Sequence, residues 1–426
     1  MAEPRVSNSL EGMRGASGLI TDLIHFPRSP LDFRFHVVTV RVDDSYESSL
    51  AESIARCVAS GISDDPELAA KAAIGEAWER IAFVDSLNQI RGSRVSLPAD
   101  TLTAEQVFRL PFLLDRSVDR EEWARQVSSV ETKTRHYRAY HKTSDSQDVE
   151  LPVAILNPLG RSSLFETTNG LACADSFEVA LDRAVREVVE RDALMLIWLT
   201  KCGGRHVAAD RYLPSSDCAQ IERMSSMGIR TVLRDISTGL GIRVFLAGIK
   251  AEFPGNRIGL AFGAGAHRSA AHAAKHAFRE ACLSWRGVAW RSITGDSPAL
   301  SAPPDSFAGH AEYYSSWDRM HFLDFLFKDE PQDAEAAATE DERIRDSGHL
   351  NILLDQGLPV YATDITPLQA SDTGLTVVQA IVPSLVPLYI GDRQADDLAW
   401  QRLPTTIGGI AQDTPVALET KVHPWP

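Results

Sequence analysis

The chain has 426 residues, 44% of them apolar, which is enough for one large domain or two ordinary domains with a sizeable core. The 58 acidic residues exceed the 43 basic ones and give a formal net charge of −15, so the surface repels phosphate backbones and no nucleic-acid partner is expected. The five cysteines form no Cys-x-x-Cys pair or zinc spacing, and no apolar run reaches the roughly 20 residues that span a bilayer. The first residues also lack the apolar core of a signal peptide, so we expect a reduced, cytoplasmic protein with no membrane segment.

The first predicted elements along the chain are a disordered end, a strand and a helix. Residues 1–16 are polar and are predicted to be disordered. The run 33–42 is rich in β-branched and aromatic residues, which predicts a strand. A helix is predicted over 66–83, because Asp65 is a favourable N-cap and Pro66 suits the first helical position.

The second half of the chain holds the segment with the strongest helical pattern. Apolar residues recur on one face over 176–200, which predicts an amphipathic helix. A further helix is predicted at 270–285 and an exposed helical insertion at 328–347, whereas 403–426 is predicted to be an irregular, proline-containing tail. Short apolar runs predict strands at 151–156, 230–236, 242–250, 257–263, 360–366 and 376–383. Because these elements follow no strict βαβ alternation, the predicted fold class is α+β (mixed α/β).

The familiar signatures of nucleotide-binding proteins and hydrolases are missing from the sequence. There is no GxxxxGK[ST], no GxGxxG after a strand, no HExxH and no GxSxG. The run FGAGAH at 262–267 contains a Gly-x-Gly and predicts a turn.

Two predicted helices carry the same short motif, Glu-x-x-Glu-Arg, inside apolar sequence. The residues are Glu76, Glu79 and Arg80 in the first helix and Glu187, Glu190 and Arg191 in the second. Residues three apart share a helical face, so each motif presents two carboxylates together, and carboxylate oxygens are ligands that Mg²⁺ prefers. The following arginines could hold phosphate oxygens or brace the carboxylates. A solvated helix face is the alternative for either copy; the second copy strengthens the case for a metal–phosphate site, and both alternatives stay open.

Three stretches of the chain resemble the YcaO family. Residues 167–198, TTNGLACADSFEVALDRAVREVVERDALMLIW, resemble its central signature, a Ser/Thr-Asn-Gly-Leu-Ala turn followed by a long helix with Glu-x-x-Glu-Arg-Asp-Ala. AAIGEAWERIA at 72–82 resembles its first glutamate helix, and 360–388 resembles its late Asp-(Ile/Leu)-Thr and Val-Pro-x-Leu segments. The resemblance implies one YcaO-like catalytic domain over 17–426, in which glutamate-bearing helices packed on sheets form an ATP site without a P-loop.

The resemblance also implies roles for single residues, with ATP and Mg²⁺ as cofactors. Glu76, Glu79, Glu187 and Glu190 would ligate the metal, Arg80 and Arg191 would contact the nucleotide, and Glu280, in AAKHAFREA, would be a further nucleotide-site carboxylate. Arg191 is also the residue expected to stabilise charge during catalysis.

The sequence departs from the family pattern at four places. His276 stands where the family usually has Arg, and His could still donate to phosphate. Asp175 replaces Asn; it could reach metal or water, or it could begin the helix as a capping box with Glu178, and both alternatives stay open. Val179 replaces a second glutamate in the first turn, and Val422 replaces the first proline of a Pro-x-Pro-x-Pro ending.

The ending VHPWP suggests a role for the tail. Prolines keep a chain extended, and Trp425 offers a large apolar anchor. We expect Trp425 to pack against the core and Pro426 to bring a carboxylate to the nucleotide site as a base or orienting group. The alternative is an ordinary frayed terminus. Cys173, beside the signature turn, is interpreted as a small packed residue rather than a nucleophile.

The activity implied by the resemblance is ATP-dependent cyclodehydration of Cys, Ser or Thr in a ribosomally made precursor peptide. The side chain attacks the preceding amide carbonyl, the amide oxygen is phosphorylated, and phosphate leaves an azoline, as in thiazole/oxazole-modified peptides of the bacteriocin and antibiotic kind. Thioamide or macroamidine formation is the alternative within the family. A catalytically weak scaffold that binds a peptide or partner is the alternative outside it.

The resemblance implies partners as well. They are the precursor peptide, a ThiF-like protein that binds its leader, and a flavin-dependent azoline dehydrogenase, within a homodimer or hetero-oligomeric complex.

Overall fold

The protein is described from a computed structural model, which divides the chain into two compact units. Unit 1 comprises 1–187 and 357–383, and unit 2 comprises 188–356 and 384–426. The description covers residues 10–26, 33–43, 58–92, 134–142, 146–152, 168–252, 259–294, 310, 313–314, 316, 318–328, 348–388, 402–413 and 417–425. Among these residues no helix is both long and apolar enough to cross a membrane.

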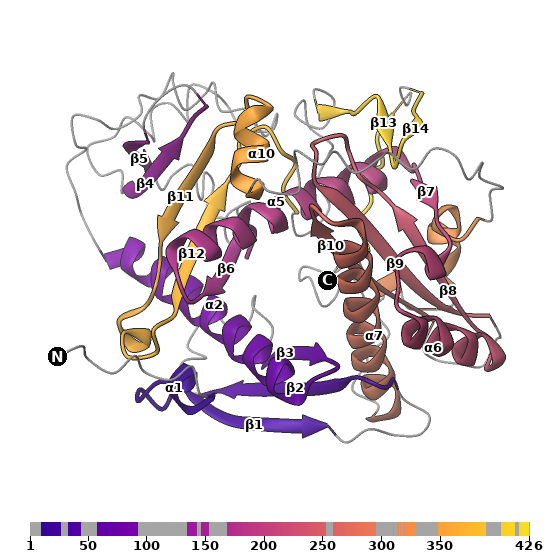
Figure 1. Cartoon of the computed structure of the whole chain (residues 1–426), viewed down its shortest axis with the longest axis horizontal. Coiled ribbons are helices and arrows are strands. Elements are labelled where there is room, and N and C mark those ends of the chain that lie inside the picture. Colours follow the sequence, from indigo (N-terminus) through magenta and orange to yellow (C-terminus); the bar gives the residue numbers. More distant parts are fainter. Residues whose placement is uncertain are drawn as a thin grey trace. The chain divides into compact units, whose positions relative to one another are not determined.

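Unit 1 packs one long helix, α2, against two antiparallel sheets (Figure 1). The first sheet has the order β1-β2-β3, and the second has the order β5-β4-β11-β12-β6. Its elements are α1 (Leu10–Arg14), β1 (Ile20–Phe26), β2 (His36–Val42), β3 (Val58–Ser63), α2 (Pro66–Gly92), β4 (Thr134–Tyr140), β5 (Gln147–Pro152), β6 (Leu171–Ala174), the start of α5 (Phe177–Thr200), β11 (Val360–Asp364), η6 (Leu368–Ala370) and β12 (Thr376–Ile381). Because α2 contacts strands of both sheets, alanines and large apolar residues are buried around it, from Ala69 to Trp78 and Ile81.

Unit 2 packs helices on a four-stranded antiparallel sheet of order β10-β9-β8-β7. The second half of α5 belongs to this unit. The other elements are β7 (Arg205–His206), η4 (Ala209–Arg211), α6 (Ser215–Ser226), β8 (Ile229–Asp235), β9 (Arg243–Ala251), β10 (Leu260–His267), α7 (Ala270–Thr294), η5 (Met320–Leu326), α10 (His349–Asp355), and the two-stranded pair β13 (Thr406–Ile407) and β14 (Ile410–Ala411). The helix α7 runs along β10 and β9 (Figure 1).

Both units contain three antiparallel strands followed by a helix that lies very close to the last strand. A Cβ built on Gly61 of β3 would lie 2.1 Å from the Ala69 carbonyl oxygen of α2. A Cβ on Gly265 of β10 would lie 2.3 Å from the corresponding oxygen, that of Ala273 in α7. Only glycine allows this backbone approach. The same number of residues separates Gly61 from Glu76 and Gly265 from Glu280, so each helix carries a glutamate at the equivalent place.

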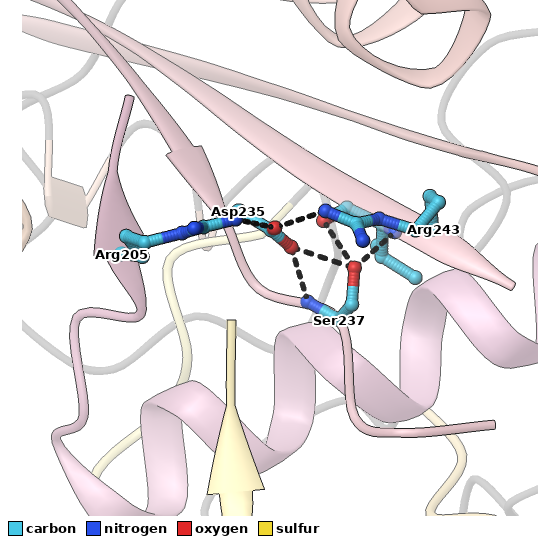
Figure 2. A network of polar contacts seen from close by, with 5 residues as sticks. Arg205, Asp235, Ser237 and Arg243 are labelled. Carbon is cyan, nitrogen blue, oxygen red and sulfur yellow. Dashed lines mark hydrogen bonds and ion pairs between the residues drawn. The ribbon is translucent and has the colours of Figure 1, made fainter. Parts of the chain in front are cut away.

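The strands of unit 2 are joined by a buried ionic network (Figure 2). The Asp235 carboxylate is 1% exposed and is ion-paired to Arg205 at 2.9 Å and to Arg243. Its Oδ1 accepts hydrogen bonds from the Ser237 N–H at 3.1 Å and hydroxyl at 2.6 Å. Two guanidinium groups and two further donors compensate the desolvation of one carboxylate, so the network holds β7 and the β8–β9 connection together.

The α+β prediction is confirmed, and the helices predicted at 66–83, 176–200 and 270–285 correspond to α2, α5 and α7. Asp65 caps α2 as predicted, because its Oδ1 accepts the Glu67 N–H at 2.7 Å. The strands predicted at 230–236 and 242–250 are β8 and β9. The predicted single domain over 17–426 stays a prediction, and the insertion over 329–347 lies outside the described residues.

Two predictions near the glycines and the N-terminus were wrong. The run 262–267 is part of the strand β10 rather than a turn, because its glycines accommodate α7. Residues 10–14, within the segment predicted to be disordered, form α1. This helix is held because Trp78 Nε1 donates to the Met13 carbonyl at 2.7 Å and Arg14 donates to the Ile20 carbonyl at 3.0 Å.

Replacing Gly265 by alanine is expected to destabilise the protein by about 3 kcal/mol, because the added methyl group must displace the α7 backbone. Gly75→Ala in α2 is the matched control, since its Cβ would have 3.8 Å to the nearest atom, Cys173 Cβ. That change should be neutral or stabilise by about 0.5–1 kcal/mol, because alanine favours helix. Urea unfolding of both variants measures the difference, and equal midpoints would show that β10 and α7 do not pack as described.

Candidate functional site

In unit 1 the structure orients both oxygens of the Glu76 carboxylate. Its Oε2 accepts the Ser60 N–H of β3 at 3.0 Å, and its Oε1 accepts Arg80 Nη2 at 2.5 Å. The side chain is 35% exposed, so one side of the group faces solvent. Arg80 therefore braces a carboxylate in this structure, which was one of the two roles considered for it.

Glu79 lies one turn further along α2 and is more deeply enclosed. Its Oε1 accepts the Cys173 N–H of β6 at 2.7 Å. Burial raises the pKa of the Glu79 carboxyl to about 8, and the nearby charges of Glu187 and Glu76 add to the increase, against the Cys173 N–H and Arg80. The charge of Glu187, from the second motif, therefore acts on Glu79, while the shared metal site of both glutamate pairs stays a prediction.

The Glu79 carboxyl has two carboxylate neighbours, Glu187 and Glu76, and one arginine neighbour, Arg80. Within the described residues, no group of three or more His, Cys, Asp or Glu side chains is arranged to hold a metal ion by itself. Mg²⁺ is commonly bound through one or two carboxylates, with waters and substrate phosphates as the remaining ligands. The donor chemistry of Glu76, Glu79 and Glu187 fits such an ion, because a positive charge would relieve the repulsion that raises the Glu79 pKa.

Among the other predicted site residues, Asp175 belongs to unit 1, and Glu190, Arg191, His276 and Glu280 belong to unit 2. Glu190 and Arg191 are partly buried on α5, and Glu280 is partly buried on α7. His276, also on α7, is exposed, and its Nδ1 lies 3.2 Å from the Ala264 carbonyl oxygen. Because a carbonyl accepts, Nδ1 carries the hydrogen, so His276 could reach a phosphate only through Nε2. Each unit therefore holds part of the predicted residue set.

Residues around the signature turn have structural roles that the sequence did not reveal. The Ser176 hydroxyl, rather than Asp175, caps α5 by accepting the Val179 N–H at 3.4 Å. The capping-box interpretation of Asp175 with Glu178 was therefore wrong, and Asp175 is exposed. Burial and the neighbouring Glu79 raise the pKa of the Cys173 thiol far above its ordinary value, so it cannot act as a thiolate nucleophile.

Two backbone donors, at Ser60 and Cys173, were missed by sequence reasoning. Both belong to strands whose positions relative to α2 are set by the tertiary structure. Nearly every residue has a backbone N–H, so residue type does not indicate which of them bind a carboxylate. Cys173 nevertheless follows the Thr-Asn-Gly-Leu-Ala turn directly, so its place in the signature was a signal that β6 approaches the glutamate helix.

The end of the chain packs as predicted at Trp425. Its side chain is 1% exposed and lies against Phe262 of β10, with ring centroids 5.3 Å apart. Val422, which replaces a proline of the family pattern, is also buried. Pro426 lies outside the described residues, so its role as a base stays a prediction.

The chain is similar to known proteins in both sequence pattern and fold. A family model described as "YcaO cyclodehydratase", ATP- and Mg²⁺-binding, matches residues 24–386. A comparison with curated proteins found no match. Three similar solved structures share 16–19% of residues with the chain, a level that establishes the fold alone.

The first is a heterocyclase in complex with substrate and cofactor, with 19% identity and a TM-score of 0.63 over 94% of this chain and 55% of that chain. The chain thus spans about half the length of that heterocyclase. The second is the E. coli microcin synthetase McbBCD complex with pro-MccB17 bound, with 16% identity and a TM-score of 0.64 over 95% of this chain and 96% of that chain. The third is YcaO from Methanopyrus kandleri bound with AMPPCP and Mg²⁺, with 18% identity and a TM-score of 0.56 over 89% of both chains.

The raised pKa of Glu79 makes stability depend on pH in the absence of nucleotide. The folded-state pKa of about 8 exceeds the ordinary value of 4.5, so the folded chain holds an extra proton between these values and loses stability as pH rises through them. Glu79→Gln should remove that loss and be more stable than wild type at pH 9 by on the order of a few kcal/mol. Urea unfolding at pH 5 and pH 9 measures the effect. Glu67→Gln, on the exposed side of the same helix, is the control; identical pH slopes for wild type and Glu79→Gln would contradict the assignment.

Proposed function

The chain belongs to the YcaO family, with ATP and Mg²⁺ as its cofactors, and we propose that it catalyses cyclodehydration of Cys, Ser or Thr in a ribosomally made precursor peptide. The observation that carries the proposal is the proximity of Glu76 and Glu187 to Glu79, whose pKa is raised to about 8 by burial and by repulsion from these two carboxylates. Such a cluster is costly without a cation, and costly charge arrangements concentrate at functional sites.

The proposed reaction converts an amide and ATP into an azoline, ADP and phosphate. The thiol or hydroxyl of the peptide loses its proton and adds to the preceding carbonyl carbon, and the resulting oxyanion takes the γ-phosphoryl group. The C–O bond then breaks, the nitrogen loses its proton, and the C=N bond of the ring forms. Mg²⁺ and ATP, when bound, supply the phosphoryl group and offset its developing charge.

Residues of each unit have proposed tasks in this reaction. In unit 1, Glu76 and Glu79 are held by backbone N–H groups, and with Glu187 they would serve as ligands of the metal ion. In unit 2, Glu190 would be a further ligand and Arg191 would contact phosphate.

The remaining nucleotide contacts are proposed for Glu280 and for His276, the latter through Nε2. Asp175 is exposed at the start of α5 and stays a proposed contact to metal or water.

Partners are proposed from what the similar structures are. One was determined with substrate, and another is a complex of several proteins with a bound precursor, pro-MccB17. By analogy we propose a precursor peptide of the bacteriocin or antibiotic kind, a ThiF-like protein that binds its leader, and a flavin-dependent azoline dehydrogenase. These would work together as a homodimer or a hetero-oligomeric complex.

A second candidate function is YcaO-type thioamide or macroamidine formation, in which sulfide or an amine replaces the side-chain nucleophile. Val422, in place of a proline of the azoline-forming pattern, favours this candidate. A catalytically weak scaffold is favoured by His276, which stands where the family usually has Arg and whose Nδ1 lies 3.2 Å from the Ala264 carbonyl oxygen.

ATP turnover tests the metal site. Glu79→Gln, Glu187→Gln and Glu190→Gln should each lower it by about 100-fold, because a lost ligand or a misplaced one weakens metal binding and charge stabilisation. Glu67→Gln, in the first turn of α2, should leave turnover unchanged. Circular dichroism and thermal unfolding establish that each variant is folded. Turnover near the wild-type rate in Glu187→Gln would remove that residue from the site, and a wild-type enzyme without turnover would favour the scaffold.

The fate of the amide oxygen distinguishes the reactions. A precursor labelled with heavy oxygen at the amide preceding Cys or Ser should transfer the label to inorganic phosphate and lose one water per ring, because the oxygen leaves as phosphate. Mass spectrometry of peptide and phosphate measures both, and loss of thiol alkylation at Cys identifies a thiazoline. Exchange of oxygen for sulfur, or dehydration that leaves the thiol free, would favour the thioamide or the macroamidine instead.

A further inference from the structure

A segment near the end of the chain, residues 417–425, is packed firmly into unit 2. Within it Leu418, Val422, His423 and Trp425 are at most 8% exposed. The segment forms no helix or strand, so its backbone polar groups need partners outside regular secondary structure. Those partners show which elements of unit 2 the segment holds together.

Several partners lie at the C-terminal end of α5. The Glu419 N–H donates to the Leu199 carbonyl at 2.9 Å, which satisfies one of the last four helix carbonyls, groups that have no partner within a helix. Trp198 Nε1 donates to the Lys421 carbonyl at 3.0 Å. The segment therefore caps the helix that carries Glu190 and Arg191.

Lys201, directly after this helix, joins the segment through its ammonium group. Its Nζ is buried, lies 3.2 Å from Glu419 Oε2, and sits 3.0 Å from the Trp198 ring centroid and 5.2 Å from that of Phe325. Burial lowers the pKa of Lys201 to about 8, although Glu419 opposes the change. An apolar side chain would fill this space at lower desolvation cost, so stability alone does not account for a lysine here. A partly enclosed ion pair, here with side chains 32% and 16% exposed, can instead select one register among several.

The other end of the segment reaches the sheet of unit 2. Trp425 Nε1 donates to the Leu194 carbonyl of α5 at 3.1 Å, and its ring packs edge-on against Phe262 of β10. Side chains alternate along a strand, so Phe262 and its neighbour Gly263, which contacts α7, face opposite sides of β10. The segment thus connects α5 to the strand whose other face supports α7.

We propose that Lys201 is a positioning residue for the nucleotide site. Together with Trp198 it fixes the register of the segment 417–425. The segment in turn fixes the position of α5, which carries Glu190, relative to β10 and α7, and α7 carries Glu280. This inference rests on the proposed function, because it assumes that these glutamates contact the nucleotide. Lys201 touches neither nucleotide nor metal in this scheme and acts through the segment.

The test compares Lys201→Met with a matched lysine of the same unit. Lys250 also pairs with a carboxylate, Asp324 at 2.6 Å, and lies over an aromatic ring, Phe327 at 5.3 Å, but it does not contact the segment. Lys201→Met should keep the wild-type melting temperature and lower the affinity for AMPPCP with Mg²⁺ by about tenfold, the effect typical of a lost orienting group. Lys250→Met should bind as wild type, and Lys201→Arg should recover most of the affinity.

Two further measurements separate positioning from general loosening. Amide hydrogen exchange without nucleotide should rise in 417–425 in Lys201→Met and stay unchanged in α6. Because the ion pair acts as a unit, adding Glu419→Gln to Lys201→Met should weaken binding no further.

The outcomes distinguish this proposal from the proposed function. Unchanged affinity and exchange in Lys201→Met, with normal binding by wild type, would overturn the positioning role alone. Additive losses in the double variant would overturn it as well. If wild type fails to bind AMPPCP with Mg²⁺, the proposed nucleotide site is wrong and the positioning role falls with it, even where exchange shows that Lys201 holds the segment.

Discussion

The direction of the site glutamates depends on how closely a helix backbone approaches a strand backbone. In unit 1 Gly61 allows α2 to lie against β3, and in unit 2 Gly265 allows α7 to lie against β10. Helices usually pack at a distance set by side chains, but here alanines and glycines bring the main chains together. This approach also puts Glu76 within reach of the Ser60 N–H, so the contact that packs unit 1 is the one that aims its carboxylate.

The buried carboxyl groups of the protein differ in the charge of their neighbours. Asp235 is stabilised by two arginines, and Asp192 by Arg402 at 3.1 Å and the Val386 N–H, although burial still raises the pKa of Asp192 to about 6. These carboxylates hold loops and strands together. Glu79 differs, because its nearest charged neighbours include two carboxylates that repel it. Asp235 and Asp192 thus have cationic partners that favour the ionised form, whereas burial and two carboxylate neighbours favour the protonated form of Glu79.

The sequence located the helices and the functional motif because both depend on local pattern. The apolar periodicity over 176–200 and the cap at Asp65 act within a few residues, and α5 and α2 begin where these signals place them. The Glu-x-x-Glu-Arg motif and the turn before β6 carried the family resemblance, which implied a metal-binding set of four glutamates, Glu76, Glu79, Glu187 and Glu190. The residue type determines the chemistry of a side chain, so candidate metal ligands could be predicted from the sequence before their geometry was known.

Tertiary structure decided what depends on backbone groups and on segments far apart in the chain. Glycine is common in turns, so the run 262–267 predicted a turn. In the structure the run belongs to β10, where its glycines leave room for the backbone of α7. The contacts of the Ser60 and Cys173 N–H donors and the raised pKa of Glu79 depend on burial and on neighbours that can lie more than a hundred positions away in sequence. The sequence by itself determined the family resemblance and the candidate site residues, since both depend on side-chain type; only the fold decided how those residues are held and charged, since distance and desolvation exist only between segments brought together.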